Sequence, residues 1–230
     1  MAGSGEITVM ASAAFDEAYK ILMPAFERAS EHNVVTIRAP TVDIMARLKG
    51  GEVVDLVIIS APSIDALIAA GKIVPGSRVD LAKSGVGVAV RAGAPRPDVS
   101  SADALRRALL AAKSIAYSTC PSGVYLADLF QRMGIADELK SKIKQIKGEP
   151  IGAAVARGEA EIGFQQVSEL LPIAGIDFLG PLPAEVQQIT VFSAGLHASA
   201  KEPAAAKAFV TFLTAPAAVP VIKKTGMEPG

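Results

Sequence analysis

Short apolar runs alternate along this chain with alanine-rich segments whose apolar residues recur at helical spacing. The most constraining run covers residues 53–60, where all but two residues are apolar. Such a run is typical of a strand that is buried on both faces of a parallel sheet. Residues 15–26 show the other period, with apolar side chains at i, i+3, i+4, i+7 and i+11. The alternation predicts an α/β fold with helices on both faces of doubly wound sheets.

The same two periods predict the individual elements. Pro24 is expected to kink or shorten the first helix, Ser63 to cap the third, and Ser100 or Ser101 to cap the fourth. The last two helices are expected over residues 203–213 and about 217–223. Strands are predicted over residues 6–10, 34–38, 53–60, 85–90, 115–117, 143–146, 161–165, 176–179 and 188–195.

The strand–helix cycle occurs about three times in the first eighty residues and then begins again without a long linker. This organisation predicts two small lobes, lobe I with residues 1–84 and 195–230 and lobe II with residues 85–194. The chain would cross between them in strands near Gly85 and Gly195, and two crossover strands make a hinge. A cleft between lobes is a favoured ligand site, so we expect the ligand there.

Composition excludes several classes of protein. The 23 basic and 23 acidic side chains cancel, which argues against a nucleic-acid partner. A hydrophobic fraction of 50% argues against disorder. No stretch reaches the roughly 18 apolar residues of a membrane span, so we expect no membrane insertion. We also expect a monomer.

The first residues carry neither a basic region nor an apolar run, so no export signal is expected here. Residues 2–5 resemble a short flexible tail. Two interpretations stay open: a cytoplasmic protein, or an exported protein whose leader is absent from this sequence.

Metal and cofactor motifs are missing from the sequence. His32 and His197 lie far apart, and neither paired cysteines nor a Gly-x-Ser-x-Gly motif occurs. Gly85 and Gly87 lack the third glycine of a nucleotide-binding loop. We therefore expect no cofactor and no metal, and we interpret the histidines as surface or capping residues.

Cys120 is more ambiguous, because it lies in a strand-to-helix turn at residues 118–123. A thiol at a helix N-terminus can become nucleophilic. That role needs a base, and neither histidine is placed by sequence to supply one. Cys120 is otherwise a small buried or cleft-lining residue.

Hydroxyl groups recur where predicted strands end. Ser12, Thr41 and Ser60 follow the first three strands, and Ser122 with Gly123 opens a helix in the second lobe. In open α/β sheets this edge carries helix N-termini whose unpaired N–H groups face the ligand crevice. Hydroxyls and N–H groups together can bind an anion without a formal positive charge. Each residue taken alone could equally be an ordinary N-cap.

Seven ordered motifs resemble the periplasmic molybdate-binding proteins of ABC importers. They are EITVMASAAFDEA at residues 6–18, DLVIISA at 55–61, KIVPGSR at 72–78, GEAEIG at 158–163, GPLP at 180–183, AKAFVTFL at 206–213 and GMEP at 226–229. The resemblance spans nearly the whole chain and implies the two-lobe type II periplasmic binding protein fold. It also implies a periplasmic location, an ABC permease as partner and a small anionic solute as ligand.

In that family the oxyanion is held by hydroxyls, backbone amides and a tyrosine. The resemblance assigns ligand binding to Ser12 with its neighbour Ala13, to Thr41, Ser122, Ile151 and Gln166. Two positions depart from the family pattern: residues 39–42 read APTV where it has Gly-Ser-Ser-Gly, and residues 163–166 read GFQQ where it has the tyrosine. An amide that can both donate and accept replaces the phenol, and its family position favours Gln166 over Gln165.

These departures widen the ligand class to a molybdate- or tungstate-like oxyanion or a small organic acid. For an organic acid, Arg38 at the end of the second strand is a candidate carboxylate clamp, although it could also be a solvated surface residue. We therefore expect a non-enzymatic solute-binding protein that closes on its ligand. The alternatives are an enzyme that uses Cys120 or a cleft carboxylate such as Glu149, and a ligand-sensing effector domain.

Overall fold

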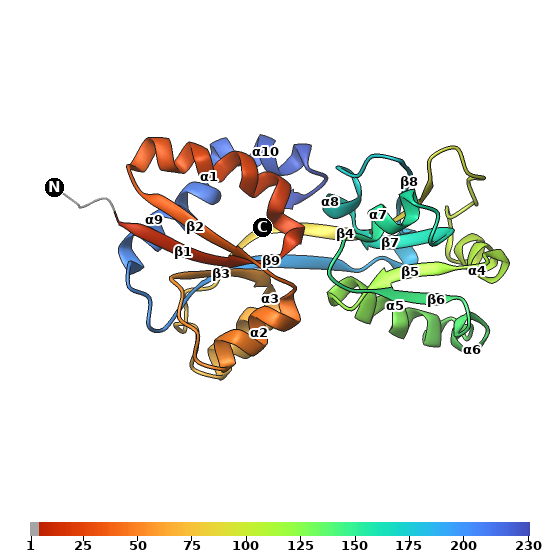
Figure 1. Cartoon of the computed structure of the whole chain (residues 1–230), viewed down its shortest axis with the longest axis horizontal. Helices are drawn as coiled ribbons and strands as arrows, with labels where there is room; N and C mark the ends of the chain where they lie inside the picture. The colour runs from red at the N-terminus through yellow and green to blue at the C-terminus, as the bar shows by residue number, and fades with distance from the viewer. Residues whose placement is uncertain (1–4) are drawn as a thin grey trace. The chain divides into compact units, whose positions relative to one another are not determined.

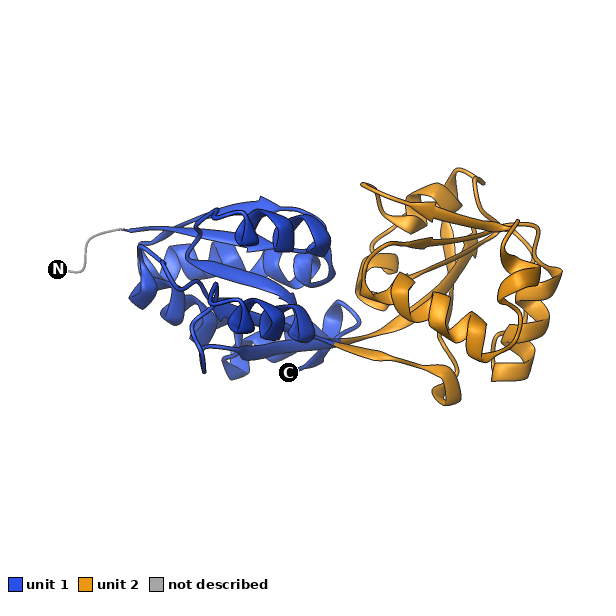
Figure 2. Ribbon diagram, turned by 90° about the horizontal axis from the view of Figure 1, so that it is seen from below, with its two compact units in different colours: residues 1–83, 191–230 blue, residues 84–190 orange. Residues whose placement is uncertain are grey.

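The computed structural model describes residues 5–230, so most of the tail predicted at residues 2–5 lies outside the described part of the chain. The chain forms two compact units (Figure 2). Unit 1 comprises residues 1–83 and 191–230, and unit 2 comprises residues 84–190. Both boundaries fall within strands, β4 (Val79–Arg91) and β9 (Ile189–Leu196).

Unit 1 is built on three parallel strands in the order β2-β1-β3 (Figure 1). Their bounds are β1 Glu6–Ala11, β2 Asn33–Arg38 and β3 Leu56–Ser60. β9 runs antiparallel to β3, and β10 (Glu228–Pro229) runs antiparallel to β4. Ala11 pairs with both Arg38 and Ile58. The carboxyl ends of the three parallel strands therefore share one edge.

Helices cover both faces of this sheet, as the continuous apolar run of β3 requires. Leu56 and Ile58 pack with the core of α1 (Asp16–Ser30), α9 (Pro203–Leu213) and α10 (Val219–Lys224). Val57 and Ile59 alternate to the other face, beneath α2 (Thr41–Lys49) and α3 (Ala61–Ala69). Short 3₁₀ turns precede α1 and α10, at Ala13–Phe15 and Pro216–Ala218.

In unit 1, the expected shortening at Pro24 and the expected cap at Ser63 are both wrong. Pro24 does not shorten α1, which runs through it for 15 residues. Ala18, Tyr19, Leu22 and Phe26 bury the helix against the sheet on both sides of the proline, and tertiary packing outweighs the lost hydrogen bond. Ser63 is not a cap, because α3 begins at Ala61 with Ser60 at the N-cap position.

Unit 2 repeats the design with three parallel strands in the order β7-β5-β6. Their bounds are β5 Ile115–Ser118, β6 Ile143–Ile146 and β7 Ile162–Gln166. β4 runs antiparallel to β7 and also pairs with β8 (Ile176–Pro181). Ile115 pairs with Ile143 and Ile162, so the carboxyl ends of these strands also share an edge.

The unit 2 sheet is covered in the same way. Ile115 and Tyr117 pack with the core of α4 (Ala102–Ala111), α5 (Pro121–Arg132) and α6 (Ala136–Leu139), while Ala116 packs with α7 (Ile151–Ala156). Ser101 caps α4 by accepting from the Ala104 N–H at 3.1 Å, one of the two caps predicted. α8 (Val167–Leu170) and the 3₁₀ turn Ala184–Val186 complete the unit.

Within residues 5–230, no single helix is both long and apolar enough to cross a membrane. One bent pair, Pro203–Leu213 with Pro216–Lys224, meets the length and composition test jointly, at an angle of 55°.

Candidate functional site

In unit 1 the structure brings together the three predicted strand-end hydroxyls. Ser12, Thr41 and Ser60 end or follow β1, β2 and β3 at the shared edge. The Ser12 N–H donates to the Ile58 carbonyl at 3.0 Å, and the Ala39 N–H donates to the Ala11 carbonyl at 3.3 Å. The three side chains therefore lie along one line of strand ends, which we call the unit 1 edge.

These hydroxyls are buried, yet they do not act as caps. Ser12 and Thr41 are only 7% and 6% exposed, and their hydroxyl groups make no hydrogen bond with any residue that the structure describes. Ser60 bonds with the Ser63 hydroxyl at 2.9 Å rather than with a helix N–H. The capping interpretation therefore does not account for Ser12, Thr41 or Ser60.

Each hydroxyl lies at the start of a helix or turn. The first hydrogen bond of α2 runs from the Ile44 N–H to the Pro40 carbonyl, so the N–H groups before it have no partner within the helix. α3 begins in the same way after Ser60. Helix N-termini carry partial positive charge. The unit 1 edge is thus a set of neutral donors suited to an anion.

Arg38, the predicted clamp, ends β2 beside this edge. Its guanidinium lies over the Tyr19 ring, 4.4 Å from the ring centroid, and forms an ion pair with Asp16. Asp16 also pairs with Lys20 at 3.1 Å. The Tyr19 hydroxyl bonds with Thr36 at 2.7 Å, and burial raises the pKa of Tyr19 to about 12. Arg38 therefore has fixed partners, although its side chain is 35% exposed.

In unit 2 the predicted turn forms the N-terminus of α5. Cys120 is the partly exposed N-cap residue, and its N–H donates to the Ser118 hydroxyl at 3.2 Å. Ser122 is 2% exposed, and its hydroxyl makes no hydrogen bond within the described chain. A Cβ on Gly123 would lie 1.6 Å from the Ser118 carbonyl oxygen. Only glycine lets the turn approach the strand this closely.

Ile151 and Gln166, two residues that the resemblance assigns to the ligand, have hydrogen-bond partners within unit 2. The Ile151 N–H donates to Gln165 Oε1 at 2.9 Å, so α7 is capped from within unit 2. Gln166 is 2% exposed and its amide faces the crossing strands. Its oxygen accepts from the Thr190 hydroxyl at 3.1 Å, and its nitrogen donates to the Ser84 and Gly85 carbonyls at 3.2 Å. The Ile151 backbone N–H and the Gln166 side-chain amide therefore both have partners inside the protein.

Other titratable groups have structural roles. Glu149 is exposed and pairs with Arg157 at 2.8 Å. His32 stacks on Phe26, with ring centroids 6.2 Å apart. His197 is 4% exposed, which contradicts its interpretation as a surface residue, and burial lowers its pKa. Among residues 5–230, no three His, Cys, Asp or Glu side chains are grouped to hold a metal ion.

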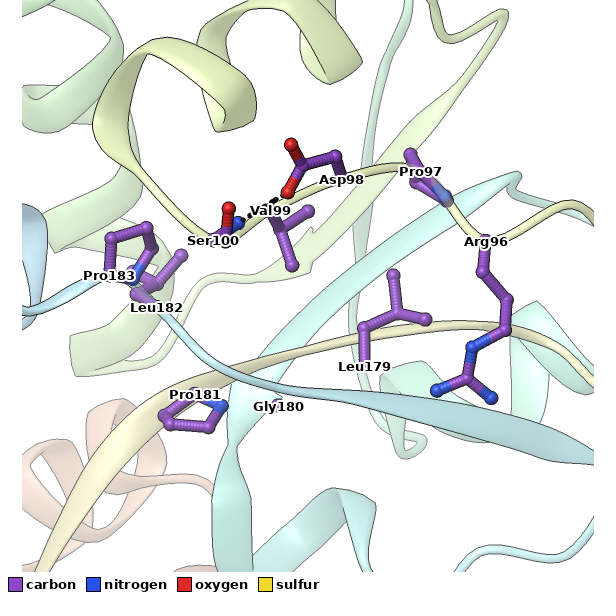
Figure 3. A pocket seen from close by; sticks show the side chains of 10 residues that line it. All are labelled: Arg96, Pro97, Asp98, Val99, Ser100, Leu179, Gly180, Pro181, Leu182 and Pro183. Atoms are coloured by element: carbon purple, nitrogen blue, oxygen red, sulfur yellow. Dashed lines mark hydrogen bonds between the residues drawn. The ribbon is translucent and has the colours of Figure 1, made fainter.

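A separate hollow of about 420 Å³ lies in unit 2 (Figure 3). The loop at residues 96–100 forms one side and residues 179–183 at the end of β8 form the other. Asp98 turns back to accept from the Ser100 N–H at 3.0 Å. None of the predicted site residues lines this hollow.

The α/β units with donors at their strand ends define the class as a type II periplasmic binding protein. The family model of the bacterial extracellular solute-binding protein matches residues 7–228, and the chain belongs to this family. The sequence resemblance to molybdate-binding proteins and the predicted fold class are thereby confirmed.

Three similar proteins give the family detail. An aconitate isomerase of Pseudomonas sp. is 38% identical over 97% of this chain and 87% of its own. The molybdate-binding protein ModA of Azotobacter vinelandii is 28% identical over 98% of this chain and 90% of its own. The solved periplasmic molybdate-binding protein of Azotobacter vinelandii superposes with a TM-score of 0.81 at 22% identity, over 97% of this chain and 99% of that one.

The isomerase corrects one prediction. The sequence led us to expect a protein that is not an enzyme, but a relative matched over nearly the whole chain is an enzyme by name. The expectation of transport alone rested on the solute-binding fold. A fold does not exclude catalysis, because enzymes and binding proteins can share the same scaffold.

Proposed function

We propose that this protein is an isomerase of a small polycarboxylate of the aconitate type. The observation that carries the proposal is the 38% identity to an aconitate isomerase over 97% of the chain. The donor sets at the strand ends support it, because carboxylates, like oxyanions, accept from N–H and O–H groups.

The reaction needs only a proton transfer. In aconitate a CH₂–carboxylate and a CH–carboxylate flank the carbon that bears the third carboxylate. When a base removes a proton from the CH₂ carbon, that C–H electron pair becomes the new double bond. The electrons of the old double bond then take a proton at the former CH carbon. The product is aconitate again, with either cis or trans geometry, and no co-reactant is consumed.

Three carboxylates need more donors than one tetrahedral ion. The unit 1 edge offers Ser12, Thr41 and the N-terminus of α2, and unit 2 offers Ser122 and the N-terminus of α5. We propose that each donor set can bind carboxylates of the ligand class. Gln166, fully bonded to the crossing strands, positions those strands rather than the ligand.

Proton transfer requires an ionisable side chain close to the ligand donors, and we assign it to Cys120. The residue is partly exposed and precedes the α5 turn that carries Ser122. A helix N-terminus stabilises a thiolate, and a thiolate can act as a general base.

The test is proton NMR of the purified protein with cis-aconitate in D₂O. We expect trans-aconitate to accumulate with deuterium at the carbons that exchange, and Ser122→Ala to slow its formation. The control is the Ser101→Ala variant, which alters a cap on α4 instead. The proposal is contradicted if the folded protein does not isomerise cis-aconitate at any pH between 6 and 9.

A second candidate is uptake, favoured by the family itself and by the two strands that join the units. In this role the protein captures a small anion in the periplasm and presents it to an ABC permease. A ligand at 100 times its Kd would then stabilise the protein by about 2.7 kcal/mol. Thermal unfolding with molybdate, tungstate, sulfate, citrate and tricarballylate tests it, and uptake is contradicted if none of these shifts the Tm.

A further inference from the structure

We infer that Arg38 is the specificity-determining residue of the unit 1 edge and selects polycarboxylates over inorganic oxyanions. The inference rests on the proposed function for the ligand class. It adds a residue and a mechanism of selection to the neutral donors described above. Ser12 and Thr41 serve any anion, whereas a guanidinium fork matches the planar carboxylate.

The position of Arg38 carries the first step. β2 ends at Arg38, which pairs with Ala11, the last residue of β1, and Ser12 follows Ala11 along the chain. Three residues after Arg38 along the chain lies Thr41, the first residue of α2. The backbone of Arg38 therefore lies at the same edge of the sheet as the backbones of Ser12 and Thr41.

The second step is that the side chain is held before a ligand arrives. Its guanidinium rests on the Tyr19 ring, whose hydroxyl is bonded to Thr36. Phe209 packs its ring against Tyr19 with a centroid distance of 5.8 Å. An arginine fixed in this way loses little conformational entropy on binding.

The third step is that much of its hydrogen-bonding capacity is unused. One terminal nitrogen faces Asp16, and the other guanidinium N–H groups have no partner within residues 5–230. Asp16 is shared with Lys20, so it keeps a cation if a ligand carboxylate takes Arg38. Arg38 would then exchange one carboxylate partner for another.

Arg47 provides the contrast and the matched control. It lies in the same unit, on α2, and its Nε and one terminal nitrogen both donate to Glu52 at 2.6 Å. That guanidinium already has a bidentate partner, and Arg47 lies in the last turn of α2, whereas Thr41 of the unit 1 edge begins that helix. Arg47→Lys therefore changes an arginine–carboxylate pair without touching the unit 1 edge.

Calorimetric titration tests the inference with tricarballylate, a saturated tricarboxylate that cannot isomerise, and with sulfate. We expect Arg38→Lys to weaken tricarballylate binding at least tenfold and to leave any sulfate affinity within twofold, with Arg47→Lys like wild type for both. Asp16→Asn, which removes the competing carboxylate, should tighten tricarballylate. Thermal unfolding confirms that each variant is folded.

The outcomes separate this inference from the proposed isomerase. Wild-type protein that binds tricarballylate but leaves cis-aconitate unchanged overturns the isomerase and keeps the clamp. Equal tricarballylate affinity in folded Arg38→Lys and wild type overturns the clamp and leaves the isomerase standing. Wild-type protein that does not bind tricarballylate also overturns the clamp.

Discussion

Gln165 closes the N-terminus of α7 by accepting the Ile151 N–H at 2.9 Å, and its amide nitrogen donates to Glu169 at 2.9 Å. The Gln165 side chain thus bonds the backbone of Ile151, a residue that the family resemblance assigns to the ligand. Within the described residues, neither the helix starts at the unit 1 edge nor the N-terminus of α5 has a side-chain cap of this kind. A ligand in unit 2 would depend on α5 rather than on α7.

The Gln165→Ala variant tests this closure. It leaves the buried Ile151 N–H without a partner, so we expect unfolding in urea to show a loss of about 1–3 kcal/mol. Gln131→Ala, at an exposed position of α5, should change stability by less than about 0.5 kcal/mol. Equal stability of the two variants would mean that the Gln165 bond is unimportant.

The strand-end hydroxyls should behave in the opposite way. Because Ser12 and Ser122 are buried without partners in the described structure, Ser12→Ala and Ser122→Ala should leave stability nearly unchanged. Each should weaken tricarballylate binding by roughly 1–3 kcal/mol if the hydroxyl bonds with the ligand. Ser101→Ala is the reciprocal control, since losing its cap costs about 1 kcal/mol of stability and should leave affinity intact. Unchanged affinity in both test variants would remove these residues from the site.

The spacing of apolar residues along the sequence explains why the strand-end hydroxyls could be predicted. A run that is apolar on both faces marks a parallel strand, and parallel strands place their carboxyl ends at one edge. The partners of Arg38 and Ile151 could not be predicted in this way, because Asp16 and Gln165 come from other elements. The hydrophobic periodicity of a sequence shows which face of a strand is buried. Tertiary packing decides which side chains of different elements come into contact.

The start of β4 shows the same limit. The strand begins at Val79, whereas the sequence predicted a start at residue 85. The prediction began too late because Asp80 and Lys83 interrupt the apolar pattern. Asp80 is nevertheless held in the sheet by the Ser193 hydroxyl at 2.7 Å. A cross-strand partner more than a hundred residues away leaves no local signal.

His197 makes stability depend on pH. Burial lowers its pKa from 6.5, the nearby Lys72 lowers it further, and Asp55 opposes both. Well above pH 6.5 the imidazole is neutral in the folded and unfolded states. As the pH falls below 6.5 the unfolded chain binds the proton first, so the folded state loses stability until the lower folded pKa is passed. Urea unfolding at pH 7.5 and 5.5 should show a smaller loss for His197→Gln than for wild type, and His32→Gln serves as the control. Identical losses in all three proteins would contradict this account.

Gly123 should tolerate no side chain. In Gly123→Ala the new Cβ would stand 1.6 Å from the Ser118 carbonyl, so the first turn of α5 must move. Overpacking of this kind costs about 1–3 kcal/mol or more, and displacement of Ser122 should also weaken ligand binding. Val124→Ala, at an exposed neighbour, should affect neither property. Thermal unfolding and calorimetric titration of the two variants decide the matter, and wild-type behaviour of Gly123→Ala would show that the turn can relax.

Cys120→Ser separates catalysis from folding at the same helix. Serine is a good N-cap residue, so the variant should be at least as stable as wild type. A hydroxyl is far less acidic than a thiol, so loss of the thiolate should abolish cis-to-trans conversion of aconitate while tricarballylate still binds. Iodoacetamide at pH 7 should likewise inactivate the wild type faster than it reacts with a small thiol, and tricarballylate should protect. If Cys120→Ser isomerises aconitate at the wild-type rate, another ionisable group carries the proton. The pH dependence of kcat in that variant would then show its pKa, because the rate follows the ionisation of the group that remains.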